Sequence, residues 1–165
     1  ALPISGHLVM EMFRSQAGID LMHVPHKLIS QTTVSLISGQ VSLWFPTMPA
    51  ALPHIGAGRM RALAAAGAKR SPALPDVPTL AEAALPGFDA STWYVVLTPA
   101  GTPKPIITRL NSEFLKALRA PQMQEKLNAQ GVESIGSTPE MAAMHIRNEL
   151  PKWAKVVKAA GARVD

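Results

Sequence analysis

Apolar and polar positions follow two different periods along the chain, and this predicts strands and helices in turn. Short apolar runs that end at Gly or Pro are typical of buried strands. Such runs occupy residues 19–24, 41–45, 60–66, 92–97 and 132–135. Apolar positions three or four residues apart predict amphipathic helices between them. These helices are expected over residues 5–16, 30–38, 47–57, 80–85, 103–119, 121–130 and 139–160. The alternation favours an α/β fold with a mainly parallel sheet.

A boundary is expected near residues 98–101, where the composition of the chain changes. Small apolar strands come before this point, and long helices with charged faces follow it. We therefore predict two units, residues 1–91 and residues 92–165, of which the second begins with a strand that crosses between them. Pro151 lies inside the last predicted helix, where it removes a backbone hydrogen bond and is expected to cause a kink.

The composition indicates a globular protein. Of the 165 residues, 47% are hydrophobic and only 16% are charged, so the chain can bury a core and keep apolar surface for a partner or a further domain. The net charge of +5 comes from scattered cations with few aromatic residues between them, which argues against nucleic-acid binding. No apolar run is long enough to span a bilayer, and no signal peptide is visible in this chain.

Reactive side chains form no recognisable catalytic or metal-binding pattern. The absence of cysteine excludes thiol catalysis and disulfides. His23 and His26 are separated by Pro25 at a strand end, so no helical face presents both rings to a metal ion. Ser5 and His7 are close in sequence, but such near neighbours on a helix do not face one another. We therefore predict no enzyme activity, no metal and no cofactor.

Two predicted helix starts remain as candidate binding elements. The first turn of a helix offers unpaired N–H donors and the positive end of the helix dipole, which suit a carboxylate. One such start is Ser5-Gly6 and the other is Leu28 to Ser30. The alternative is that each start only caps its own helix.

Short motifs along nearly the whole chain are shared with a known family. They include His23-Val24-Pro25, Gly39-Gln40-Val41, Leu52-Pro53-His54-Ile55, Lys69-Arg70-Ser71-Pro72-Ala73-Leu74-Pro75-Asp76-Val77-Pro78-Thr79, Pro99-Ala100-Gly101-Thr102-Pro103, and Trp153-Ala154-Lys155-Val156-Val157. Together they resemble the Bug (TctC-like) family of periplasmic solute-binding proteins, the receptors of tripartite tricarboxylate transporters.

The resemblance implies a fold and a function. The fold would be that of a type II-like periplasmic binding protein, an α/β protein of which this chain supplies the second lobe and the C-terminal part of the first lobe. The function would be to bind a small carboxylate in the periplasm and deliver it to membrane transporter subunits. The residues implied in ligand contact are Ser5, Gly6, His7 and Lys27.

The chain departs from the family pattern beside the expected ligand. The family reads Tyr-Lys-Gly-Gly after His23-Val24-Pro25, and here these places hold His26, Lys27, Leu28 and Ile29. Branched side chains there disfavour the close backbone approach that glycines permit. A second interpretation is therefore a truncated or diverged member that no longer binds ligand and acts at most as an interaction domain. Apolar helix faces at Ile106, Leu110 and Phe114 would then favour self-association.

Overall fold

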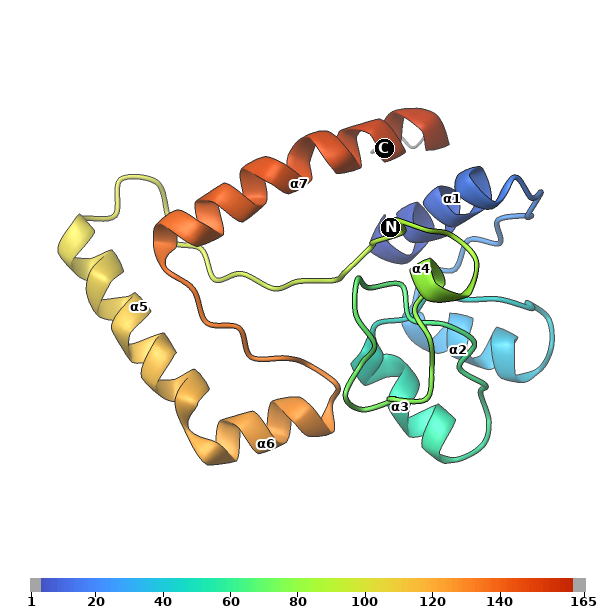
Figure 1. The fold of residues 1–165 in the computed structure, drawn as a ribbon, viewed down its shortest axis with the longest axis horizontal. Coiled ribbons are helices and arrows are strands. Elements are labelled where there is room, and N and C mark those ends of the chain that lie inside the picture. Colours follow the sequence, from blue (N-terminus) through green and yellow to red (C-terminus); the bar gives the residue numbers. More distant parts are fainter. Residues whose placement is uncertain (1–3, 162–165) are drawn as a thin grey trace.

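The structure is a computed structural model that describes residues 4–161, in which helices are joined by long extended segments (Figure 1). The helices are α1 (Ile4–Ala17), α2 (Ile29–Ile37), α3 (Met48–Gly56), α4 (Leu80–Ala83), α5 (Lys104–Arg119), α6 (Pro121–Ala129) and α7 (Pro139–Ala160). Each corresponds to a helix expected from the sequence. None of the helices within residues 4–161 is both long and apolar enough to cross a bilayer.

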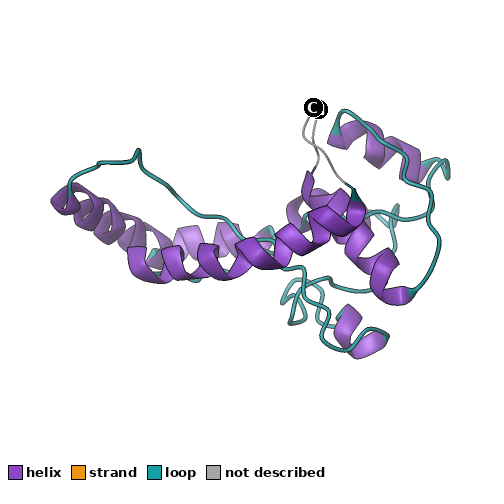
Figure 2. Ribbon diagram, turned by 90° about the horizontal axis from the view of Figure 1, so that it is seen from above, coloured by secondary structure: helices purple, strands orange, loops and turns teal. Residues whose placement is uncertain are grey.

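The expected strands are not formed as regular elements, and this prediction was wrong for residues 4–161. Helices and loops account for that part of the chain (Figure 2), and the β-pairing within it is an isolated parallel bridge between Ala65 and Thr79. The N–H of Ala65 donates to the carbonyl of Pro78, and the N–H of Leu80 donates to the carbonyl of Ala65, both at 2.8 Å. Within residues 4–161 the other apolar segments form no backbone ladder with another segment, and a strand is defined by the neighbour that pairs with it.

The buried core lies in the body formed by residues 4–90. Phe88 is its centre, with a side chain only 1% exposed, and Val9 of α1 and Leu80 of α4 pack around it. Trp153 of α7 covers the same cluster, so the last helix returns to pack against the first (Figure 1). The N-terminus of α4 is fixed by a capping box, in which Thr79 and Glu82 exchange backbone and side-chain hydrogen bonds.

A second part of the chain leaves this body and returns to it. Residues 92–97 extend away from the core, and α5 and α6 pack against one another (Figure 1). Gly131, just after α6, lies against Met48 and Leu52 of α3, and residues 132–137 then lead back to α7. The backbone groups of residues 92–98 make no backbone–backbone hydrogen bond within the described chain. Their side chains are also exposed, since Tyr94 is 71% and Leu97 is 73% accessible.

One carboxylate joins the outgoing segment to the returning helix. Glu149 of α7 accepts hydrogen bonds from the indole N–H of Trp93 at 3.2 Å and of Trp153 at 2.8 Å. Lys152 donates to the other carboxylate oxygen at 3.2 Å. Partial burial acts to raise the pKa of Glu149, but the two indole donors and the Lys152 ammonium outweigh it, so the pKa lies below its ordinary value. The ionised carboxylate therefore fixes the point where residues 92–97 leave the core.

Replacing Glu149 by Leu should destabilise the protein, because both indole N–H groups lose their acceptor in a partly buried place. The expected loss in free energy of unfolding is about 1–3 kcal/mol, measured by urea denaturation. Glu149→Gln should cost less, since an amide oxygen still accepts. Glu125→Leu, at an exposed position on α6, is the matched control and should change stability by less than about 0.5 kcal/mol. Equal effects of the two leucine variants would contradict this role for Glu149.

Candidate functional site

An open hollow of about 720 Å³ lies where the loop before α2 meets that helix. The residues that line it come from the end of the loop and from one face of the helix. They are Pro25, His26, Lys27, Ser30, Gln31, Val34 and Ser35. The sequence analysis placed Lys27 at a ligand, and the structure places its side chain on the wall of this hollow.

The N-terminus of α2 opens at the same hollow. Its N-cap residue, Leu28, makes no side-chain capping hydrogen bond, and its carbonyl accepts from the N–H groups of Gln31 and Thr32. Ser30, in the first turn, lines the hollow together with Lys27. The positive end of the helix dipole and the Lys27 ammonium therefore act on the same space, and both favour an anion.

A hydrogen-bonded chain connects the loop to the interior of α2. One ring nitrogen of His26, Nδ1, lies 3.1 Å from the carbonyl of Val24, and Nε2 lies 2.9 Å from the hydroxyl of Ser35. Ser35 is the buried residue of α2, and its hydroxyl donates to Gln40 at 3.3 Å. The sequence analysis did not identify His26, Gln31 or Ser35. The available signal was the spacing of Gln31 and Ser35, which are four residues apart on the predicted helix and therefore share one side of it.

His7 lies against the middle of the same loop. Its ring stacks on that of His23 with the centroids 4.0 Å apart and the planes 6° from parallel. Glu11, one turn along α1, approaches His7 Nε2 at 3.7 Å and also accepts two hydrogen bonds from Arg14. His23 falls in the strand expected over residues 19–24, and the structure shows it instead in a loop that its ring attaches to α1.

The other expected contact residues are placed by α1. Gly6 packs so closely against the segment after α2 that an added Cβ would lie 3.0 Å from the carbonyl oxygen of Phe45. Ser5 belongs to the first turn of α1, and its side chain lies outside the described residues. Among the residues whose side chains the structure describes, Lys27 lines the hollow, whereas Gly6 and His7 do not.

The departure from the family pattern after Pro25 has a visible backbone consequence. Leu28 has φ −130° and ψ 144°, and within residues 4–161 positive φ occurs at glycines alone. The loop therefore does not adopt the glycine-type conformation there, and side chains of the loop and of α2 line the hollow instead. No group of three or more His, Asp or Glu side chains among the described residues is placed to hold a metal ion.

Acid should loosen the loop at His23. Burial of the ring against His7 lowers the pKa of His23 from its ordinary value of 6.5, His7 and His26 lower it further, and Glu11 acts in the opposite direction. A lowered pKa means that the folded state favours the neutral ring, so this contribution is complete above pH 6.5 and is lost as the pH falls through the lower folded-state value.

As the pH is lowered below 6.5, the urea midpoint of the wild type should therefore fall more steeply than that of His23→Gln. His145→Gln, on α7, is the matched control and should keep the wild-type slope. Parallel pH profiles for the wild type and His23→Gln would contradict the role given to the stacked rings.

Comparison with known proteins identifies relatives of this chain in sequence and in fold. The model of a family described as "Tripartite tricarboxylate transporter family receptor" matches residues 3–162. Protein BugT of Bordetella pertussis is 37% identical over 164 residues, which are 99% of this chain and 50% of BugT. The chain thus spans about half the length of this relative.

Two solved structures share the fold. The structure of Rpa4515 from R. palustris with adipate has a TM-score of 0.86 and 37% identity, over 95% of this chain and 52% of its own. The periplasmic binding protein BugD has a TM-score of 0.82 and 30% identity, over 95% and 53% of the two chains. The expected fold class is confirmed at this level: the chain has the fold of about half a periplasmic binding protein.

Proposed function

The chain belongs to the tripartite tricarboxylate transporter receptor family, and on this premise we propose that it forms one wall of a binding site for a small carboxylate. Its role is to carry the acid in the periplasm to membrane transporter subunits, without chemical conversion. The observation that supports this most directly is the hollow in which Lys27 and the N-terminus of α2 meet. Both supply positive electrostatic potential, and the first turn of the helix supplies N–H donors.

A dicarboxylate suits this arrangement better than a neutral solute. The Lys27 ammonium takes one carboxylate together with the first turn of α2. The second carboxylate is assigned to the N–H groups of Ser5, Gly6 and His7 at the start of α1, which is also a positive helix end. A relative that is 37% identical was solved with adipate, a dicarboxylate, and this supports the choice of ligand class.

We also propose which lobe of the binding protein each of the two units of the chain belongs to. Residues 1–91 correspond to the second lobe of the binding protein. Residues 92–165 cross to the first lobe and supply its C-terminal part. The ligand then lies between the lobes, and the hollow beside Lys27 is one side of that cleft.

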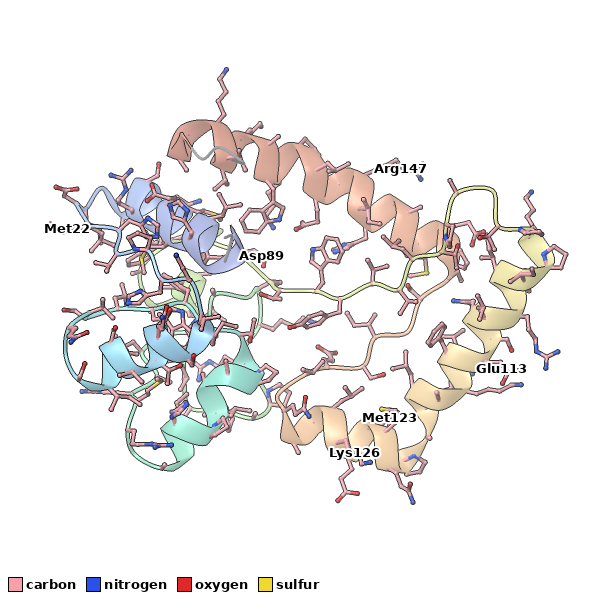
Figure 3. The ribbon with its side chains drawn as sticks, turned by 180° about the vertical axis from the view of Figure 1, so that it is seen from behind. Met22, Asp89, Glu113, Met123, Lys126 and Arg147 are labelled. Carbon is pink, nitrogen blue, oxygen red and sulfur yellow. The ribbon has the colours of Figure 1, made fainter. Side chains whose placement is uncertain are left out.

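Removing the Lys27 charge should weaken carboxylate binding. Losing a charge-assisted hydrogen bond at an exposed site is expected to raise the Kd for adipate about tenfold in Lys27→Gln, measured by calorimetry across mono-, di- and tricarboxylates. Lys126→Gln is the matched control, because Lys126 lies on α6, far along the chain from this loop (Figure 3). Binding that is equal in both variants, or absent for every acid in the folded wild type, would contradict the proposal.

A second candidate function is that of an interaction domain which associates through apolar surface. The observation that favours it is the exposure of large side chains along the two unpaired segments, with Val96 at 67% and Ile135 at 79%. Ile106, Leu110 and Phe114 of α5 are exposed as well. Apolar surface of this kind, beside backbone groups that lack partners, is typical of a face that binds another polypeptide.

If this surface causes self-association, a charge within it should oppose that association. Leu97→Lys should shift the sedimentation profile of the protein toward the monomer at concentrations where the wild type associates, because burying an ammonium between apolar surfaces is costly. Thr108→Lys, at an exposed position on α5, should leave the profile unchanged. A wild type that stays monomeric at about 100 μM, well above the Kd of an ordinary specific complex, would exclude self-association.

A further inference from the structure

The loop that carries Lys27 is held in place by side chains rather than by its backbone. Residues 20–27 make no backbone–backbone hydrogen bond within the described chain. The loop is also highly exposed, with Met22 at 91% (Figure 3). Without other attachments, such a segment would sample many conformations.

Three side-chain contacts attach this loop to the rest of the protein, and they differ in strength. Asp20 pairs with Arg14 at 3.9 Å, but its carboxylate is fully exposed, so water and salt screen the pair. His23 stacks on His7, which holds the middle of the loop to α1. His26 joins the loop to the buried hydroxyl of Ser35 on α2, directly beside Lys27.

We propose that His26 is a positioning residue that holds Lys27 at the hollow by linking the Val24 carbonyl to the Ser35 hydroxyl. The proposal rests on the proposed function of the hollow, since it concerns the residue that keeps Lys27 there. Ser35 is the anchor in this arrangement, because it is buried and belongs to a helix. The backbone carbonyl of Ser35 also accepts a hydrogen bond from the N–H of Val41. Ser35 is therefore bonded to the loop before α2 and to the segment after it.

The chemistry of the imidazole ring explains why histidine can form this link. A carbonyl only accepts hydrogen bonds, so Nδ1 carries a hydrogen toward Val24. In the neutral ring, Nε2 then accepts from the Ser35 hydroxyl, which can rotate to donate. In the protonated ring, Nε2 donates to the same oxygen, and the hydroxyl proton is then free to be donated to the Gln40 side-chain oxygen, which lies 3.3 Å away. The hydrogen bonds of His26 to Val24 and to Ser35 therefore exist in either charge state of the ring.

The contact between His26 and Ser35 therefore differs from the contact between His7 and His23 in its response to acid. Two stacked rings repel one another when both are protonated, so the contact between His7 and His23 is weakened by acid. The charged groups around that stack are Glu11 and Arg14 of α1, Asp20 at the start of the loop, and His26. The link from His26 to Ser35 keeps Lys27 beside α2 when the middle of the loop is released.

Trypsin offers a direct readout of the position of Lys27, because it cleaves after this residue only when the loop can leave α2. His26→Phe keeps a flat ring but removes both hydrogen bonds, and cleavage after Lys27 should become roughly tenfold faster. Cleavage after Arg59, on another loop, serves as the internal control and should be unchanged. His26→Gln keeps one donor and one acceptor and should restore part of the protection.

Ser35→Ala tests the same hydrogen bond by removing the hydroxyl that His26 contacts. It should accelerate cleavage after Lys27 to a similar degree, and the double variant with His26→Phe should add little, because both changes remove the same link. Binding of adipate should weaken about tenfold in His26→Phe, since the ligand then has to order the loop. His145→Phe, on α7, should leave both measurements unchanged.

Two results would overturn the proposal. One is an unchanged rate of cleavage after Lys27 in His26→Phe. The other is a uniform acceleration at Lys27 and Arg59, which would mean that His26 supports global stability and not the position of the loop. If the folded wild type binds no carboxylate, the proposed function fails, but the proteolysis still decides whether His26 positions Lys27.

Discussion

A buried extended segment needs hydrogen-bond partners from the rest of the chain, because water does not reach its backbone groups, and the core depends on meeting this requirement. Residues 64–66 satisfy it, because Ala65 pairs with the segment around Thr79 and the carbonyl of Ala66 accepts from Ala90. These few contacts enclose Phe88 and create the core on which α1, α4 and α7 pack. Residues 92–98 do not satisfy it, and both their backbone groups and their apolar side chains remain exposed.

The helices could be predicted from the sequence because the information for a helix is local. Thr79 and Glu82 form a capping box that is visible as a four-residue pattern, and the Thr138 hydroxyl caps α7 by accepting the N–H of Met141. Strands require a partner that is distant in sequence or lies on another segment, so an apolar run such as residues 92–97 predicts the tendency to pair but not the pairing itself. The α/β class was correct as a description of the family fold, while individual strands within the described chain were not.

The same distinction explains what could be predicted of the site. Lys27 could be named because it matches the family motif after Pro25, and it lies on the wall of the hollow, where its contact with a ligand stays a prediction. Gly6 was expected to contact a ligand. The structure gives another reason for a glycine at this position, because a larger residue would crowd the carbonyl oxygen of Phe45. His26 and Ser35 were missed because their hydrogen bond joins a loop to a helix nine residues further on, and this depends on how the loop folds back. Side-chain links of this kind have no fixed sequence spacing.

If the proposed function holds, Leu28 and Ile29, in the places where the family pattern has glycines, change how the loop binds an anion. Glycines let backbone N–H groups approach a ligand closely, at the cost of a flexible chain. Here the backbone stays in ordinary extended geometry at Leu28, and the positive groups are the Lys27 side chain and the first turn of α2. A long lysine side chain reaches a ligand without a special backbone conformation, but it loses more entropy when it is fixed. Fixing the loop at the residue next to Lys27 reduces that cost, and this gives the link between His26 and Ser35 a physical reason to exist in a chain that lacks the glycines.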